Sequence, residues 1–161
     1  MTDFSYLNVD NAYKLINQKV TKTPLVTNDY INNLLEAEIY FKLENLQNTG
    51  SFKLRGATHK ITKLKESVKD AGVVAYSSGN HAQAVAYASM INSISAKIIM
   101  PKTAPQIKIE NTKNYGAEVI LYDTYFQNRE EIGNNLWNEK EILMSLNDKN
   151  FFGRACLYNK K

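Results

Sequence analysis

The sequence has little that would support disulfides, zinc binding or a membrane span. A single cysteine, Cys156, excludes an internal disulfide, and no group of Cys and His residues has zinc spacing. The longest apolar runs are four or five residues, so we expect no membrane-spanning segment. The first residues also lack a basic stretch followed by an apolar one, as in a secretory signal, so we expect a cytoplasmic location.

Arginine and glycine are also scarce. Arginine occurs only at positions 55, 129 and 154, and the net charge of +4 comes mainly from scattered lysines, so we expect no nucleic-acid partner. The seven glycines include no adjacent pair, and no G-x-G-x-x-G pattern follows a strand, which disfavours a nucleotide-binding Rossmann module. Hydrophobic residues make up 43% of the chain, which is enough for a globular core.

Strand-like and helix-like segments alternate from residue 71 onward. This alternation predicts right-handed βαβ units, with a parallel sheet covered by helices. The expected strands are Val73–Tyr76, Ala96–Met100 and Glu118–Tyr122. The expected helices are His81–Ile91, Lys102–Tyr115, with Pro105 in its first turn, and Gln127–Glu139.

The first seventy residues have a different pattern. It predicts a helix over Asn11–Lys19, an extended segment at Thr23–Leu25 and a strand over Glu38–Leu43. A second helix is expected over Ser51–Lys65, with Ser51 as its N-cap. The inner face of that helix is predicted from apolar residues three or four apart: Leu54, Ala57, Ile61 and Leu64.

Lys53 would then lie in the first turn of a helix, just after Asn48–Ser51. The positive end of the helix macrodipole favours a neutral amine, and a neutral amine can bond to an aldehyde as a Schiff base. On the other hand, one lysine among many is most simply a surface residue. This segment alone favours the surface interpretation.

A second segment of interest is SSGNHAQA, residues 77–84. It forms a turn between a predicted parallel strand and a helix, which is where open α/β sheets bind ligands. Amide groups at the start of the helix suit a carboxylate or a phosphate. An ordinary strand-to-helix loop would also use small polar residues, so both interpretations stay open.

Taken together, KLENLQNTGSFKLRGA (42–57) and VVAYSSGNHAQAVAYAS (73–89) closely resemble the threonine dehydratase and serine racemase family of pyridoxal-phosphate enzymes, which have fold type II. TKTPL (21–25) and MPKTAPQIKIENTKNYGAEVILYD (100–123) agree with that family in the expected order. The resemblance runs from about residue 5 to residue 140. FKLRGA is similar to the dehydratase and racemase branch rather than to the cysteine synthases.

The resemblance implies cofactor-binding roles for three residues. Lys53 would form the Schiff base with pyridoxal 5′-phosphate and would act as the base at the substrate Cα. Phe52 would pack near the cofactor. Asn80 would donate a hydrogen bond to the hydroxyl of the cofactor ring.

The resemblance also implies a substrate site and a reaction. Ser78 would serve as an acid or base on the face opposite Lys53. The reaction would be β-elimination, which converts a hydroxy amino acid to a 2-oxo acid and ammonia; the sequence does not separate threonine from serine, or elimination from racemisation. The substrate carboxylate would be surrounded by Ser77, Ser78, Gly79, Asn80 and His81.

The expected fold class is α/β, with a parallel βαβ small domain and an incomplete N-terminal portion of a larger α/β domain. Residues 1–65 are assigned to the larger domain, 66–140 to the small domain and 141–161 to a divergent tail. Members of the resembled family are longer and bind the cofactor phosphate with a glycine-rich loop that this sequence lacks. We therefore expect a truncated chain with weak cofactor binding and impaired or no catalysis. The alternative is a non-catalytic remnant. Self-association or a complementing C-terminal chain is the expected partnership.

Overall fold

The computed structural model describes residues 6–68, 72–136 and 142–144 of the 161-residue chain. Within these ranges no helix is both long and apolar enough to cross a membrane. Cys156 lies outside the described residues, as does most of the predicted tail.

A four-stranded parallel sheet has the strand order β5–β4–β3–β6. The strands are β3 (Val73–Tyr76), β4 (Ala96–Pro101), β5 (Glu118–Tyr122) and β6 (Ile142–Met144). The first three match their predicted bounds within one residue, so the α/β class with a parallel sheet is confirmed. We did not predict β6, because three residues are too few to show a periodic pattern.

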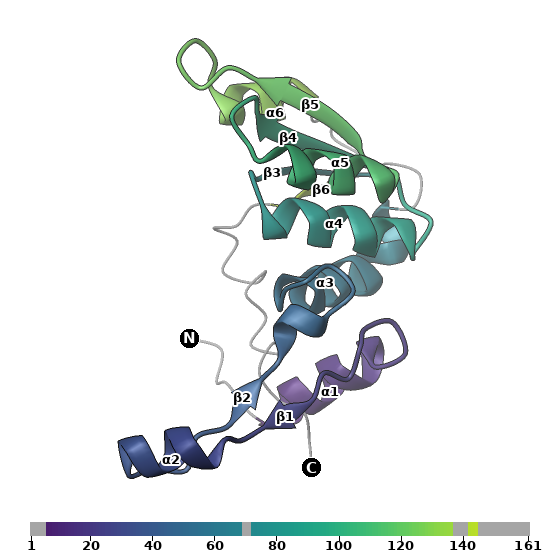
Figure 1. Cartoon of the computed structure of the whole chain (residues 1–161). Helices are drawn as coiled ribbons and strands as arrows, with labels where there is room; N and C mark the ends of the chain where they lie inside the picture. The colour runs from purple at the N-terminus through teal and green to yellow at the C-terminus, as the bar shows by residue number, and fades with distance from the viewer. Residues whose placement is uncertain (1–5, 69–71, 137–141, 145–161) are drawn as a thin grey trace.

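Helices cover both faces of the sheet because successive strand residues point to opposite sides. Val73 and Ala75 belong to the large apolar core, on the side of α4 and α5, whereas Val74 packs in a smaller cluster with Ile132 of α6. The three helices are α4 (Asn80–Met90), α5 (Gln106–Asn114) and α6 (Arg129–Leu136). Figure 1 shows α4 below the sheet, with α3 on the far side of α4.

The helix α3 (Lys53–Val68) packs along α4, and α1 (Tyr6–Ile16) packs against α3. Leu54, Ala57 and Ile61 of α3 are at most 1% exposed, and Leu64 packs partly buried against the same core, which confirms the predicted inner face. The large core thus runs continuously from the sheet through α4 into α3.

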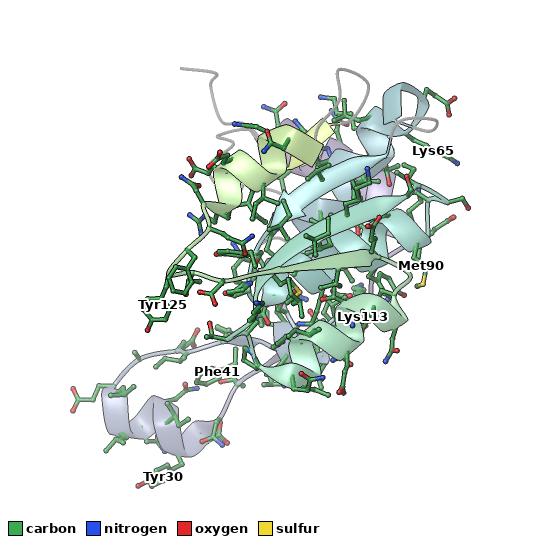
Figure 2. The ribbon with its side chains drawn as sticks, turned by 90° about the horizontal axis from the view of Figure 1, so that it is seen from above. Tyr30, Phe41, Lys65, Met90, Lys113 and Tyr125 are labelled. Atoms are coloured by element: carbon green, nitrogen blue, oxygen red, sulfur yellow. The ribbon has the colours of Figure 1, made fainter. Side chains whose placement is uncertain are left out.

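Residues 25–42 form an extension that we call the N-terminal arm. It consists of β1 (Leu25–Val26), the helix α2 (Asp29–Leu35) and β2 (Phe41–Lys42), which pairs antiparallel with β1. The side chain of Asn28 caps α2 by accepting a hydrogen bond from the Ile31 amide at 3.0 Å. No residue of α2 is buried, and Figures 1 and 2 show this helix, with Tyr30, extending away from the sheet.

Several predictions for the first seventy residues were wrong. The helix α1 begins five residues before the predicted Asn11 and ends three residues before Lys19, because its buried face runs through Val9, Ala12 and Ile16. Only Phe41–Lys42 of the predicted strand Glu38–Leu43 pairs with another strand. The helix α2 was missed altogether.

The predicted starts of α3 and α5 also need correction. Ser51 does not cap α3: its buried hydroxyl has no hydrogen-bond partner among the described residues, and the turn is closed by backbone bonds instead. The predicted helix from Lys102 starts only at Gln106. Pro105 precedes this helix with φ −54° and ψ 130°, and a proline also keeps the residue before it extended. The predicted end of the third helix, residues 137–139, lies outside the described residues.

Candidate functional site

Lys53 is the first residue of α3 and follows a tight turn. Gly50 has φ +68°, which is a left-handed conformation suited to glycine, and its amide donates to the Gln47 carbonyl at 2.7 Å. Lys53 is half-buried, and its Nζ lies 5.1 Å from the centroid of the Phe52 ring. Phe52 is itself 40% exposed, so its ring keeps a surface that a ligand could contact.

The turn before Lys53 is tied to two helices beyond it in the sequence. Asn48 donates through Nδ2 to the Tyr87 hydroxyl of α4 at 3.0 Å, and its carbonyl accepts from the Tyr115 hydroxyl at 3.4 Å. The two tyrosine rings meet edge to face with centroids 5.2 Å apart. These contacts fix the start of α3 against the helix that follows the second motif.

That second motif occupies the carboxyl end of β3, as predicted. The Ser77 amide donates to the Ile99 carbonyl at 3.1 Å, which continues the strand pairing, and Ser77 Oγ accepts from the Gly79 amide at 3.3 Å. Ser78 is exposed. A Cβ added to Gly79 would meet no atom within 4 Å, so there is open space beside this turn.

The predicted substrate-binding residues are not all equally accessible. His81 is 2% exposed and lies in the first turn of α4, whereas Asn80 beside it is exposed. Asn80 Oδ1 accepts a hydrogen bond from Lys108 Nζ of α5 at 2.7 Å. One turn further on, Gln83 Oε1 accepts from Asn111 Nδ2 at 3.1 Å.

A partly buried ion pair includes Arg55, which lies two residues after Lys53. Arg55, which is 2% exposed, donates to both carboxylate oxygens of Glu44, at 2.9 and 2.7 Å. It also donates to the Thr21 carbonyl at 3.1 Å, while the Thr23 hydroxyl donates to Glu44 at 2.5 Å. This cluster joins the TKTPL and KLEN segments to α3, close to the candidate site.

The hydrogen bonds of this cluster lower the pKa of the Glu44 carboxylate. Burial alone would raise the pKa of Glu44, but hydrogen bonds from Arg55 and Thr23 outweigh it and hold that pKa below its usual value. Burial first, and then the charge of Arg55, lowers the pKa of Lys42.

Sequence reasoning missed several residues that shape the site. Lys108, Tyr87 and Tyr115 are distant in sequence from the residues that they contact, and nothing in their local patterns indicates these contacts. For Arg55 there was a signal, since arginine is rare in this chain and one of its three arginines lies two residues from Lys53.

Comparisons with known proteins indicate the family of this chain. A family model described as "Pyridoxal-phosphate dependent enzyme" matches residues 16–155. L-threo-3-hydroxyaspartate ammonia-lyase of Saccharomyces cerevisiae is 44% identical over 132 residues, which are 82% of this chain and 40% of that protein. Serine racemase of Schizosaccharomyces pombe is 44% identical over 139 residues, which are 86% of this chain and 43% of that protein.

Solved structures give the same result. A serine racemase from Dictyostelium discoideum has a TM-score of 0.83 and 37% identity, over 91% of this chain and 48% of that one. A serine racemase from maize has a TM-score of 0.83 and 34% identity, over 91% of this chain and 45% of that one. The chain spans about 40% of the length of the curated relatives that it matches. The expected resemblance is therefore confirmed: the chain belongs to the family of pyridoxal-phosphate dependent enzymes.

Proposed function

We propose that this chain carries the lysine and the carboxylate-binding turn of a pyridoxal-phosphate enzyme that removes ammonia from a hydroxy amino acid. The main support is the position of Lys53, at the start of a helix whose preceding turn is bonded to α4 through Asn48 and Tyr87. Relatives named as ammonia-lyases and threonine dehydratases, with 42–44% identity, support this reaction class. Racemisation is the related alternative, since other relatives are named serine racemases.

The residues present fit the cofactor in chemical terms. Lys53 offers an amine, Asn80 offers an exposed amide, and the open space at Gly79 leaves room beside the start of α4. Lys53 and Asn80 would hold pyridoxal phosphate, with the Phe52 ring packed beside it. When bound, the cofactor supplies an electron sink for the negative charge that develops at the substrate Cα.

The residues of the chain would divide the remaining work. The Lys53 amine would take the proton from Cα, and the exposed Ser78 hydroxyl would exchange a proton on the other face of the substrate. The amides at the start of α4, an 11-residue helix, would bind the substrate carboxylate. Net loss of the Cα proton and the β-hydroxyl as water, followed by hydrolysis, would give a 2-oxo acid and ammonia.

A second candidate is a non-catalytic module, which the exposed apolar side chains of the arm favour. Leu25, Tyr30, Leu34 and Tyr40 are 54–75% exposed. The sequence also has no adjacent glycines to bind the cofactor phosphate, and each charge-assisted hydrogen bond lost there would cost about 1.5–3 kcal/mol. Self-association or a complementing chain would cover the arm.

The division of the chain into part of a larger domain (1–65) and a small domain (66–140) stays a prediction. The cytoplasmic location also stays a prediction.

The deciding experiment is a titration of the purified chain with pyridoxal phosphate, followed by borohydride reduction and peptide mass analysis. We expect a visible absorbance band and a cofactor adduct on Lys53. The variant Lys53→Ala should lose both, whereas Lys63→Ala, which removes an exposed lysine from the same helix, should keep them. No band at saturating cofactor, or a band unchanged in Lys53→Ala, would contradict the proposal for this chain.

A further inference from the structure

Two hydrogen bonds connect the polar faces of α4 and α5. Lys108 Nζ donates to Asn80 Oδ1 at 2.7 Å, and Asn111 Nδ2 donates to Gln83 Oε1 at 3.1 Å. In each helix the partners are three residues apart, so the bonds lie one above the other along both helices. In both bonds the amide oxygen on α4 is the acceptor.

The two bonds differ in their surroundings. Gln83 is 2% exposed and lies between the helices, so its bond satisfies a buried group. Asn80 is exposed and begins α4, directly after the turn with open space at Gly79. A bond at an exposed position contributes little to folding, so its main effect is on the orientation of the amide.

The chemistry of lysine fixes that orientation. A lysine ammonium donates hydrogen bonds and accepts none, so it must face the amide oxygen of Asn80. The Nδ2 group of Asn80 is then turned away from Lys108, with its protons available to an acceptor. The charge on Lys108 also makes the bond stronger than one between two neutral groups.

We propose that Lys108 is a positioning residue for the cofactor: it holds the Asn80 amide with its protons toward the ring oxygen of pyridoxal phosphate. This inference rests on the proposed function, in which Asn80 binds the cofactor. Lys108 does not touch the cofactor in this role and acts through Asn80. The α5 helix thereby contributes to a site that its own sequence pattern does not indicate.

The test compares the dissociation constant for pyridoxal phosphate, measured by absorbance, in a set of variants. Lys108→Gln should weaken cofactor binding about tenfold, because the charge-assisted hydrogen bond that orients the Asn80 amide is lost. Lys108→Arg, which keeps a charged donor, should restore most of the affinity. Lys113→Gln is the matched control, because Lys113 is an exposed lysine near the end of the same helix, labelled in Figure 2, and it should bind like the unaltered chain.

A double-mutant cycle separates positioning from a general structural role. In an Asn80→Ala background, Lys108→Gln should cause no further weakening, because the residue through which it acts is gone. If the losses of cofactor affinity in Lys108→Gln and Asn80→Ala add fully in the double variant, the inference is overturned. It is also overturned if Asn80→Ala weakens cofactor binding and Lys108→Gln leaves it unchanged. Urea unfolding midpoints of all variants identify any that lose affinity by unfolding.

A second measurement does not depend on the cofactor. In the side-chain amide NMR spectrum of the chain without cofactor, Lys108→Gln should shift the Asn80 Nδ2 resonances and leave those of Asn111 in place. An unmoved Asn80 signal would overturn the inference. No cofactor uptake by any variant would overturn both the inference and the proposed function, whereas uptake that is indifferent to Lys108 would overturn the inference alone.

Discussion

The sheet region and the N-terminal arm are held in place by different interactions. In β3, Val73, Val74 and Ala75 are at most 2% exposed, whereas α2 in the arm has no buried residue. The apolar core therefore stabilises the sheet and its helices and does not extend into the arm. Two strands of two residues each would be marginal on their own.

Polar contacts hold the base of the arm instead. The Arg55 guanidinium donates hydrogen bonds to Glu44, just after β2, and to the Thr21 carbonyl, before β1. The Lys42 ammonium donates to the Thr23 carbonyl. The comparison shows that α3 serves both regions: its apolar face joins the core, while its first turn, which contains Lys53 and Arg55, anchors the arm. The candidate site lies at this junction.

Removing Arg55 should have the largest effect, because it separates the arm from the rest of the molecule. Arg55→Met leaves the Glu44 carboxylate partly buried without its bidentate partner, and we expect a loss of about 3–5 kcal/mol in the free energy of unfolding. Urea unfolding at pH 7 measures it. Adding Glu44→Gln should restore part of the loss, since the unpaired charge is removed. A loss below about 1 kcal/mol would mean that the cluster does not anchor the arm.

Matched leucines compare the two regions directly. Leu54 in α3 is 0% exposed, and Leu34 in α2 is 67% exposed. Leu54→Ala should cost about 2–5 kcal/mol, since it leaves a cavity in the core. Leu34→Ala should change stability by less than about 0.5 kcal/mol. Similar losses in the two variants, measured by urea unfolding at several protein concentrations, would show that the arm is buried by self-association.

The parts of the fold that could be predicted are those that carry a periodic apolar pattern. The strands Val73–Tyr76 and Glu118–Tyr122 were predicted at their observed bounds, because each reads as a short apolar run in the sequence, although only the first of them is largely buried. The arm gave no such pattern. Its helix α2 has no buried face, and β6 pairs through only three residues, so neither left a signal in the sequence.

The candidate site could be predicted only in part. Lys53 and the 77–81 turn were predicted from local motifs, and the structure places each at the start of a helix, as expected. Ser51, however, does not cap the helix that begins at Lys53. The residues that orient these motifs come from elsewhere in the chain. Lys108 reaches Asn80 and Tyr87 reaches Asn48 only because the helices pack as they do, and no local pattern shows this packing.

The smallest expected effect concerns His59, on the α3 helix that joins the two regions. Burial first, and then the charges of Lys63 and Lys60, lowers the pKa of His59 from its usual value of 6.5. The unfolded chain therefore takes up this proton at a higher pH than the folded chain. The contribution of His59 to stability is fully present above about pH 6.5 and is lost as the pH falls through the lower folded-state pKa.

His59→Gln should flatten the dependence of the unfolding free energy on pH between pH 8 and 5. Glu44 does not interfere, because its pKa is lowered from 4.5 and so lies below this window. If the difference in unfolding free energy between the unaltered chain and His59→Gln stays constant from pH 8 to 5, then the His59 side chain is not shielded from solvent. The side of α3 that carries His59 would then be less firmly packed than the inner face of that helix.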